Sequence, residues 1–224
     1  MRTLFLKCVM ALAVVLSASA VSAAPILTFT FSGKVSTIIS DDGSGTFGAN
    51  FAVGDAVTGS WTFDAAATQN PILPYASAYD ATFSVTISGK TFSGGAEYRI
   101  FDDAPGGGDD GFSVINETGT YTGPSLGSLQ PRSFFLQFLG MPTTTLLNQN
   151  IVTNPDVLMP LANPTYAPHG FRLDNPRDET FGGLYFTIDS VRRVPEPSTL
   201  WLMLLGVVVM VGYVRWRRTS PSVA

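Results

Sequence analysis

Residues 82–92 read TFSVTISGKTF, and their pattern decides the fold class of the chain. In the first half, the apolar side chains Phe83, Val85 and Ile87 alternate with hydroxyl-bearing ones. Successive side chains of a strand point to opposite faces of a sheet, so this half predicts a strand with one buried face. The tight turn signal Ser88-Gly89-Lys90 follows, and the alternation then resumes. Together these features predict a β-hairpin.

The same period of two recurs on either side of this hairpin. Further strands are predicted over residues 27–35, 57–64, 98–101, 111–115, 133–139 and 183–191. Trp61 falls on the apolar side of its segment and is therefore expected in the core. The stretch 140–178 is rich in Pro, Asn and Thr, and is predicted to form long loops with at most one short strand.

These strands predict an all-β domain over residues 24–193. One face of each strand must be buried, so an antiparallel β-sandwich of jelly-roll type fits the pattern best, and a barrel is the alternative. The 22 glycines and 15 prolines of the chain suit a domain with many turns.

The expected domain is acidic. Residues 24–193 carry eight Lys and Arg against sixteen Asp and Glu, a net charge of about −8. Neutralising phosphates requires clustered basic side chains, which the sequence does not offer, so a nucleic-acid partner is not expected. Cys8, the single cysteine, precedes the domain, so no disulfide, Cys nucleophile or Cys metal ligand is expected in it.

Residues 1–23 are predicted to be a signal peptide. Basic residues open the chain, and the apolar run CVMALAVVL at 8–16 is too short to span a bilayer. Small residues follow, and Val21-Ser22-Ala23 suits cleavage between Ala23 and Ala24, with Ala18-Ser19-Ala20 as a second candidate site. Such a segment implies the Sec machinery and a signal peptidase as partners.

A second apolar segment, about residues 198–214, is predicted to be one transmembrane helix. The 18 residues between Glu196 and Arg215 carry no charge. At about 1.5 Å per residue, they reach about 27 Å, which is just enough to cross a bilayer core. Arg215, Arg217 and Arg218 follow at once. Positive flanks resist translocation, so the arginines and the tail 219–224 are expected in the cytoplasm, with the domain outside.

The residues before this span read Val194-Pro195-Glu196-Pro197-Ser198-Thr199. Each proline fixes its own backbone and disfavours helix in the residue before it, so the stretch is expected to be extended. An extended stretch at the membrane surface is well shaped for the peptide groove of an enzyme. Pro195, Glu196 and Pro197 are therefore the candidate processing motif.

In this order and at this end of the chain, the Pro-Glu-Pro motif, the span and the arginines resemble the PEP-CTERM family of sorting signals. The resemblance covers residues 194–218. It implies processing by exosortase, a membrane protease-transpeptidase, in a Gram-negative bacterium that makes exopolysaccharide. A plain tail anchor without processing is the alternative.

Catalytic and transition-metal sites are not expected. His169 is the single histidine, and it stands in Tyr-Ala-Pro-His-Gly, a segment predicted to be a surface loop. A Ser-His-Asp triad needs its histidine in a scaffolded pocket near the nucleophile, and a surface loop does not provide one. One histidine without cysteine is a poor ligand set for zinc or copper.

Calcium needs only oxygen ligands, and Asp102, Asp103, Asp109 and Asp110 surround a glycine-rich stretch. Their spacing is not that of a known calcium loop. Asp and Gly are also common turn formers, so the stretch is either a speculative calcium site or a turn without a metal.

The remaining expectation concerns glycans. Aromatic rings in loops can stack on sugars, and four tyrosines are predicted in loops: Tyr75, Tyr79, Tyr121 and Tyr166. We expect a non-catalytic exported protein, anchored in the inner membrane and then placed at the cell surface or in the extracellular matrix with exopolysaccharide. The alternative is a carbohydrate-binding or carboxylate-dependent glycan hydrolase domain on the same anchor.

Overall fold

The computed structural model describes residues 25–40, 45–104, 109–118, 121–124, 126–161, 169–174, 177, 180–195, 206 and 208–209. In chain order its named elements are β1 (Ile26–Ser40), α2 (Thr46–Asn50), β2 (Ala56–Asp64), β3 (Asn70–Leu73), β4 (Ala76–Ile87), β5 (Lys90–Ala104), β6 (Asp109–Asn116), β7 (Tyr121–Thr122), β8 (Gln130–Met141), α3 (Pro155–Leu158), the 3-10 helix η1 (Met159–Leu161), β9 (His169–Asp174) and β10 (Phe181–Val194).

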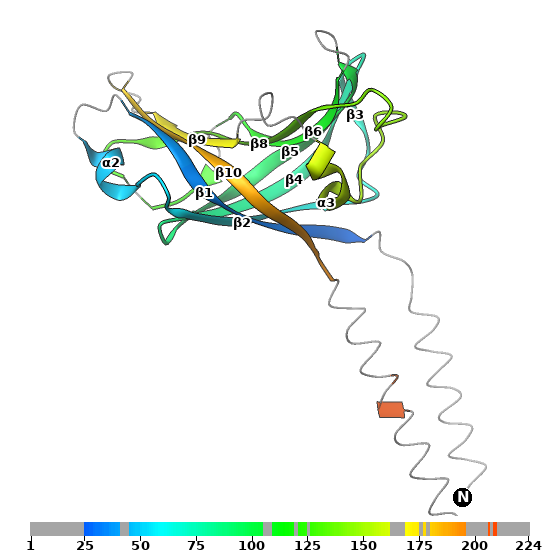
Figure 1. The fold of residues 1–224 in the computed structure, drawn as a ribbon, viewed down its shortest axis with the longest axis horizontal. Coiled ribbons are helices and arrows are strands. Elements are labelled where there is room, and N and C mark those ends of the chain that lie inside the picture. Colours follow the sequence, from blue (N-terminus) through cyan, green and yellow to red (C-terminus); the bar gives the residue numbers. More distant parts are fainter. Residues whose placement is uncertain are drawn as a thin grey trace, which may run out of the picture.

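The strands form a closed antiparallel barrel. Neighbours follow the order β4-β2-β1-β10-β9-β8-β6-β5, and β5 pairs back with β4 to close the ring (Figure 1). β3 and β7 extend the sheet as short extra strands on β4 and β5. The all-β, antiparallel prediction is confirmed. The sandwich is corrected to a barrel, because β4 and β5 stay paired from Ala76 to Phe101 and leave no gap between two sheets.

The predicted hairpin is present as the β4–β5 turn. Ser88 and Gly89 have φ of 51° and 75°. Positive φ at both central residues defines a type I′ turn, whose twist matches that of the flanking strands. This turn sets the register in which Ile87 faces Lys90 and every later pair follows.

Aromatic side chains fill the barrel interior. Trp61 is fully buried, as predicted, and its ring stacks on Phe29 with the centroids 5.3 Å apart. Tyr98 is also fully buried and stacks on Phe63 at 4.5 Å. Each such side chain removes roughly 150–250 Å² of surface from water, so this stack is the main source of stability.

The stretch predicted to be loops closes one end of the barrel. Tyr98 donates its hydroxyl hydrogen bond to the Val152 carbonyl at 3.1 Å, and Tyr79 donates to that of Gln149 at 2.8 Å. α2 lies at the opposite end (Figure 1), where Phe47 is buried. Within the described part of 140–178, β9 is the one strand that follows the end of β8 at Met141, in agreement with the prediction, and α3 and η1 are short helices.

β1 and β10 bring the two ends of the domain together. They pair antiparallel from Thr28 opposite Val194 to Ser40 opposite Gly182, with register shifts next to Gly33 and Val35. Figure 1 shows both strands crossing the barrel toward the end at which the chain enters and leaves. Whatever precedes Pro25 and follows Pro195 therefore starts from the same end of the barrel.

Candidate functional site

The predicted acidic site lies where β5 turns into β6. One carboxylate oxygen from each of Asp102, Asp103 and Asp110 lies within 4.8 Å of the others. Burial raises the pKa of Asp102, and the charges of Asp110 and Asp103 raise it further. The side chain of Asp109 lies outside the described part of the chain. The structure thus brings three of the four predicted ligands together.

Asp110 has a structural task in this cluster. It is fully buried, and its two carboxylate oxygens accept hydrogen bonds from the main-chain N–H groups of Asp103, at 3.1 Å, and Leu146, at 2.6 Å. These bonds fasten the loop after β8 to the β5–β6 hairpin. Calcium takes six to eight oxygens, and three carboxylates alone do not complete such a shell. A calcium site here stays a prediction.

His169 is not in a surface loop, as the sequence had suggested, but is the first residue of β9. Its ring packs against those of Phe138 and Phe186, with centroids 4.9 and 5.8 Å away, and its Nδ1 accepts a hydrogen bond from the Gln137 N–H at 3.2 Å. Burial lowers the pKa of His169 from its ordinary value of 6.5 to about 4. The ring is therefore a neutral, partly buried group at pH 7.

Acid should destabilise the protein through His169. The unfolded chain keeps a histidine pKa near 6.5, so it takes up a proton before the folded chain does, and stability is lost as the pH falls from 6.5 through about 4. The shift corresponds to about 3 kcal/mol of unfolding free energy. Urea unfolding across this window measures it. In His169→Gln, which retains an acceptor but does not titrate, this part of the loss should vanish, and equal acid loss in both proteins would rule the explanation out.

Three of the four tyrosines placed in loops by the sequence can be located. Tyr79 lies in β4 and Tyr121 in β7, and both side chains are buried, so for these two the loop prediction is wrong. Tyr75 lies in the turn between β3 and β4 and is partly exposed. Tyr166 lies outside the described residues. The buried pair serves to close the barrel and does not offer a sugar platform.

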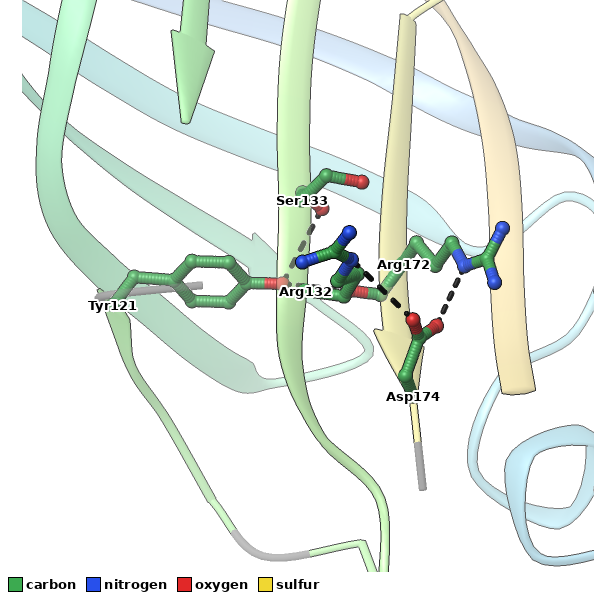
Figure 2. Close-up of polar contacts among 5 residues, drawn as sticks. All are labelled: Tyr121, Arg132, Ser133, Arg172 and Asp174. Atoms are coloured by element: carbon green, nitrogen blue, oxygen red, sulfur yellow. Dashed lines mark hydrogen bonds and ion pairs between the residues drawn. The ribbon is translucent and has the colours of Figure 1, made fainter. Parts of the chain in front are cut away.

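A second polar cluster, which the sequence did not indicate, joins β7, β8 and β9 (Figure 2). The Tyr121 hydroxyl donates a hydrogen bond to the Arg172 carbonyl oxygen at 2.8 Å and lies 3.3 Å from the Ser133 carbonyl oxygen. Burial raises the pKa of Tyr121. On the outer surface, Arg172 and Arg132 both reach Asp174. Their Nε atoms lie 2.5 and 3.5 Å from its two carboxylate oxygens.

This cluster carries an excess of positive charge. Two guanidinium groups share one carboxylate, and both arginine side chains remain about half exposed, at 60% for Arg132 and 46% for Arg172. The Arg172 guanidinium also lies over the Phe181 ring, 4.3 Å from its centroid. In a domain with a net charge of about −8, such a place can attract an anion.

The predicted sorting segment begins where β10 ends. Val194 is the last residue of the strand, and Pro195 follows it. The other predicted elements lie outside the described residues, namely Ala23 and Ala24, Glu196 and Pro197, and Arg215, Arg217 and Arg218. Among the residues that the structure describes, none forms a helix long and apolar enough to cross a membrane.

The fold thus defines a class: a closed antiparallel β-barrel domain whose two ends meet at one side, followed by a short C-terminal segment. That segment can be identified more closely. Residues 193–218 match the PEP-CTERM protein-sorting motif, so the chain carries a C-terminal sorting segment of this type. The motif implies export, C-terminal membrane anchoring and exosortase as the processing partner. Neither the curated proteins nor the solved structures contain a match to the chain.

Proposed function

We propose that this protein is a non-catalytic surface or extracellular-matrix protein of a Gram-negative bacterium, released from its membrane anchor by exosortase and associated with exopolysaccharide. The observation that carries the proposal is the sorting motif at residues 193–218, which starts on the last two residues of β10. In this proposal a signal peptidase removes residues 1–23, and the tail holds the domain only until processing.

The geometry of the barrel supports this use of the tail. Five residues, 195–199, separate the end of β10 from Leu200, after which the residues up to Val214 are almost all apolar. A fully extended chain covers at most about 3.6 Å per residue, so this tether reaches about 18 Å. The anchored precursor would hold the end of the barrel that carries Thr28 and Val194 against the membrane. Its other end, with α2, would point away from the membrane.

The packing of the barrel supports a role for its outside. The interior is occupied by close-packed aromatic side chains, among them Trp61, Phe83 and Phe138. A protein interior of this kind is packed to about the density of an organic crystal, so its side chains are not available to a polymer outside. Contacts with a matrix polymer would therefore fall on the outward faces of the strands and on the loops.

Glu196→Ala tests the sorting role while leaving the apolar span intact. Losing one charge-assisted hydrogen bond in an enzyme groove costs about 1.5–3 kcal/mol, so processing should slow by at least about tenfold. Immunoblots of membrane and released fractions would then show precursor accumulating in the membrane. Asp189→Ala is the matched control, because it removes an exposed acid of β10 outside the motif. Equal processing of Glu196→Ala and the unaltered protein would reject the proposal.

A further inference from the structure

A hollow lies on the outer face of the barrel above Gly183 of β10. A Cβ atom added at this glycine would lie 3.5 Å from the main-chain oxygen of Phe171 and 3.7 Å from that of Ile39. Both are ordinary contact distances. Apart from Gly183 and its two chain neighbours, no other residue has a heavy atom within 4 Å of that position. The missing side chain leaves an open hollow of about 190 Å³.

The register of three strands frames this hollow. Arg172 of β9 and Ile39 of β1 pair with Gly183 from either side, and Phe181 and Tyr185 lie two residues away along β10. Residues two apart share a face of the sheet, so all four side chains surround the empty position. Tyr185 and Ile39 are 38% and 39% exposed. An aromatic ring therefore stands on each side of the hollow along β10.

A third ring widens the platform next to Tyr185. Phe135 of β8 lies over Gly170 of β9, where an added Cβ would come within 2.3 Å of the ring. Because Gly170 has no side chain, the Phe135 ring can lie against the backbone of β9. The Phe135 and Tyr185 rings meet edge to face, with centroids 6.3 Å apart. The result is a shallow aromatic surface with a hollow at its centre.

The positive charge of the arginines beside the hollow favours an anionic ligand. Arg172 lines the hollow and binds Asp174 through Nε, and Figure 2 shows the terminal nitrogens of its guanidinium turned away from that carboxylate. Arg132 adds a second guanidinium next to it. An arginine fork binds carboxylates in a planar, two-point geometry, and stacking on Phe181 holds this fork in place. The site thus combines rings for an apolar face with donors for a carboxylate.

We propose that this hollow binds one carboxylated sugar unit, a uronic acid residue, of an acidic polysaccharide. The sugar ring places its C–H face against Tyr185 and Phe181, and its carboxylate accepts hydrogen bonds from Arg172. The volume is below the roughly 300–1,000 Å³ of pockets for drug-sized ligands, which suits a single ring of a longer chain. The proposal deepens the proposed function and rests on it, since it names the chemistry of the glycan partner.

The test uses the full chain in a detergent without a sugar headgroup and measures binding of oligogalacturonate by calorimetry. Millimolar or tighter binding is expected, at least about tenfold tighter than that of a neutral oligosaccharide of equal length. Gly183→Val fills the hollow and leaves every charge in place, and it should weaken binding by at least about tenfold. Arg172→Gln should do the same, whereas Arg99→Gln, which alters a guanidinium paired with Glu97 and Glu117 elsewhere, should not.

Three results would overturn the proposal: no binding of oligogalacturonate at millimolar concentration, full binding by Gly183→Val, or equal binding of the neutral oligosaccharide. Preferential binding of an acidic peptide over the sugar would overturn it as well, because the hollow would then recognise a protein. Circular dichroism of each variant establishes that it is folded. Because binding by purified protein needs no exosortase, failure here is distinct from failure of the Glu196→Ala experiment.

Discussion

Gly33→Ala should destabilise the folded barrel by about 3 kcal/mol or more. A Cβ at this position would lie 1.8 Å from the main-chain oxygen of Thr187 and 2.8 Å from its carbonyl carbon. Real Cβ atoms do not approach that closely, and the obstacle is backbone that cannot rotate away. The two strands would have to separate at the register shift where Gly33 faces Ile188.

The consequence reaches beyond local packing. The β1–β10 pair closes one side of the ring and places the start and the end of the domain at the same end. For a domain of this size, about 3 kcal/mol corresponds to a fall in Tm of roughly 6–12 °C. Thermal unfolding followed by circular dichroism measures it directly.

Gly183→Ala on the same pair of strands is the matched control. Its added methyl group enters the open hollow at ordinary contact distances, so the unfolding free energy should stay within about 0.5 kcal/mol of the original. If both variants unfolded alike, the cause would be a general intolerance of the strands to alanine. If neither variant were destabilised, the close approach of β1 to β10 at Gly33 would be wrong.

Truncation after Pro197 should move the protein from the membrane to the soluble fraction almost completely. The change removes the apolar run and the three arginines and leaves the barrel and the Pro-Glu-Pro residues in place. An apolar helix of about 20 residues holds a protein in a bilayer effectively irreversibly, and nothing else in the described barrel offers such a segment.

Fractionation of cells that lack exosortase measures this effect without interference from processing. The full chain should sediment with membranes, and the truncated chain should not. Glu196→Ala serves as the control, because it keeps the span and should remain in the membrane fraction. A truncated protein that still sediments with membranes would place the anchor elsewhere in the chain.

The strands and the central hairpin could be predicted because their signal is local. The alternation around Phe83 and Val85 and the turn at Gly89 fix both the strand and its partner within a few residues. β3 and β7, of four and two residues, are too short to show a period. β9 follows a proline-rich stretch, and that composition indicates a loop around His169 rather than a strand.

Closure into a barrel could not be predicted, because sandwiches and barrels share the same alternation along each strand. The difference lies in which strands pair, as when β9 joins β8 to β10. The outer hollow was missed for the same reason: Phe135, Arg172 and Tyr185 come from three strands that meet only in the fold. Gly182-Gly183 inside an otherwise regular strand was the signal available, since glycine there often marks a close approach or an open site.

The central claim is that the tail is a temporary anchor removed by exosortase. The intact mass of the protein recovered from exosortase-containing cells tests it most directly. We expect a product that starts at Ala24, ends close to the Pro-Glu-Pro motif and lacks the apolar run and the arginines, while cells without exosortase retain the whole tail. A mature protein that still carries residues 198–224 in both kinds of cell would contradict the claim.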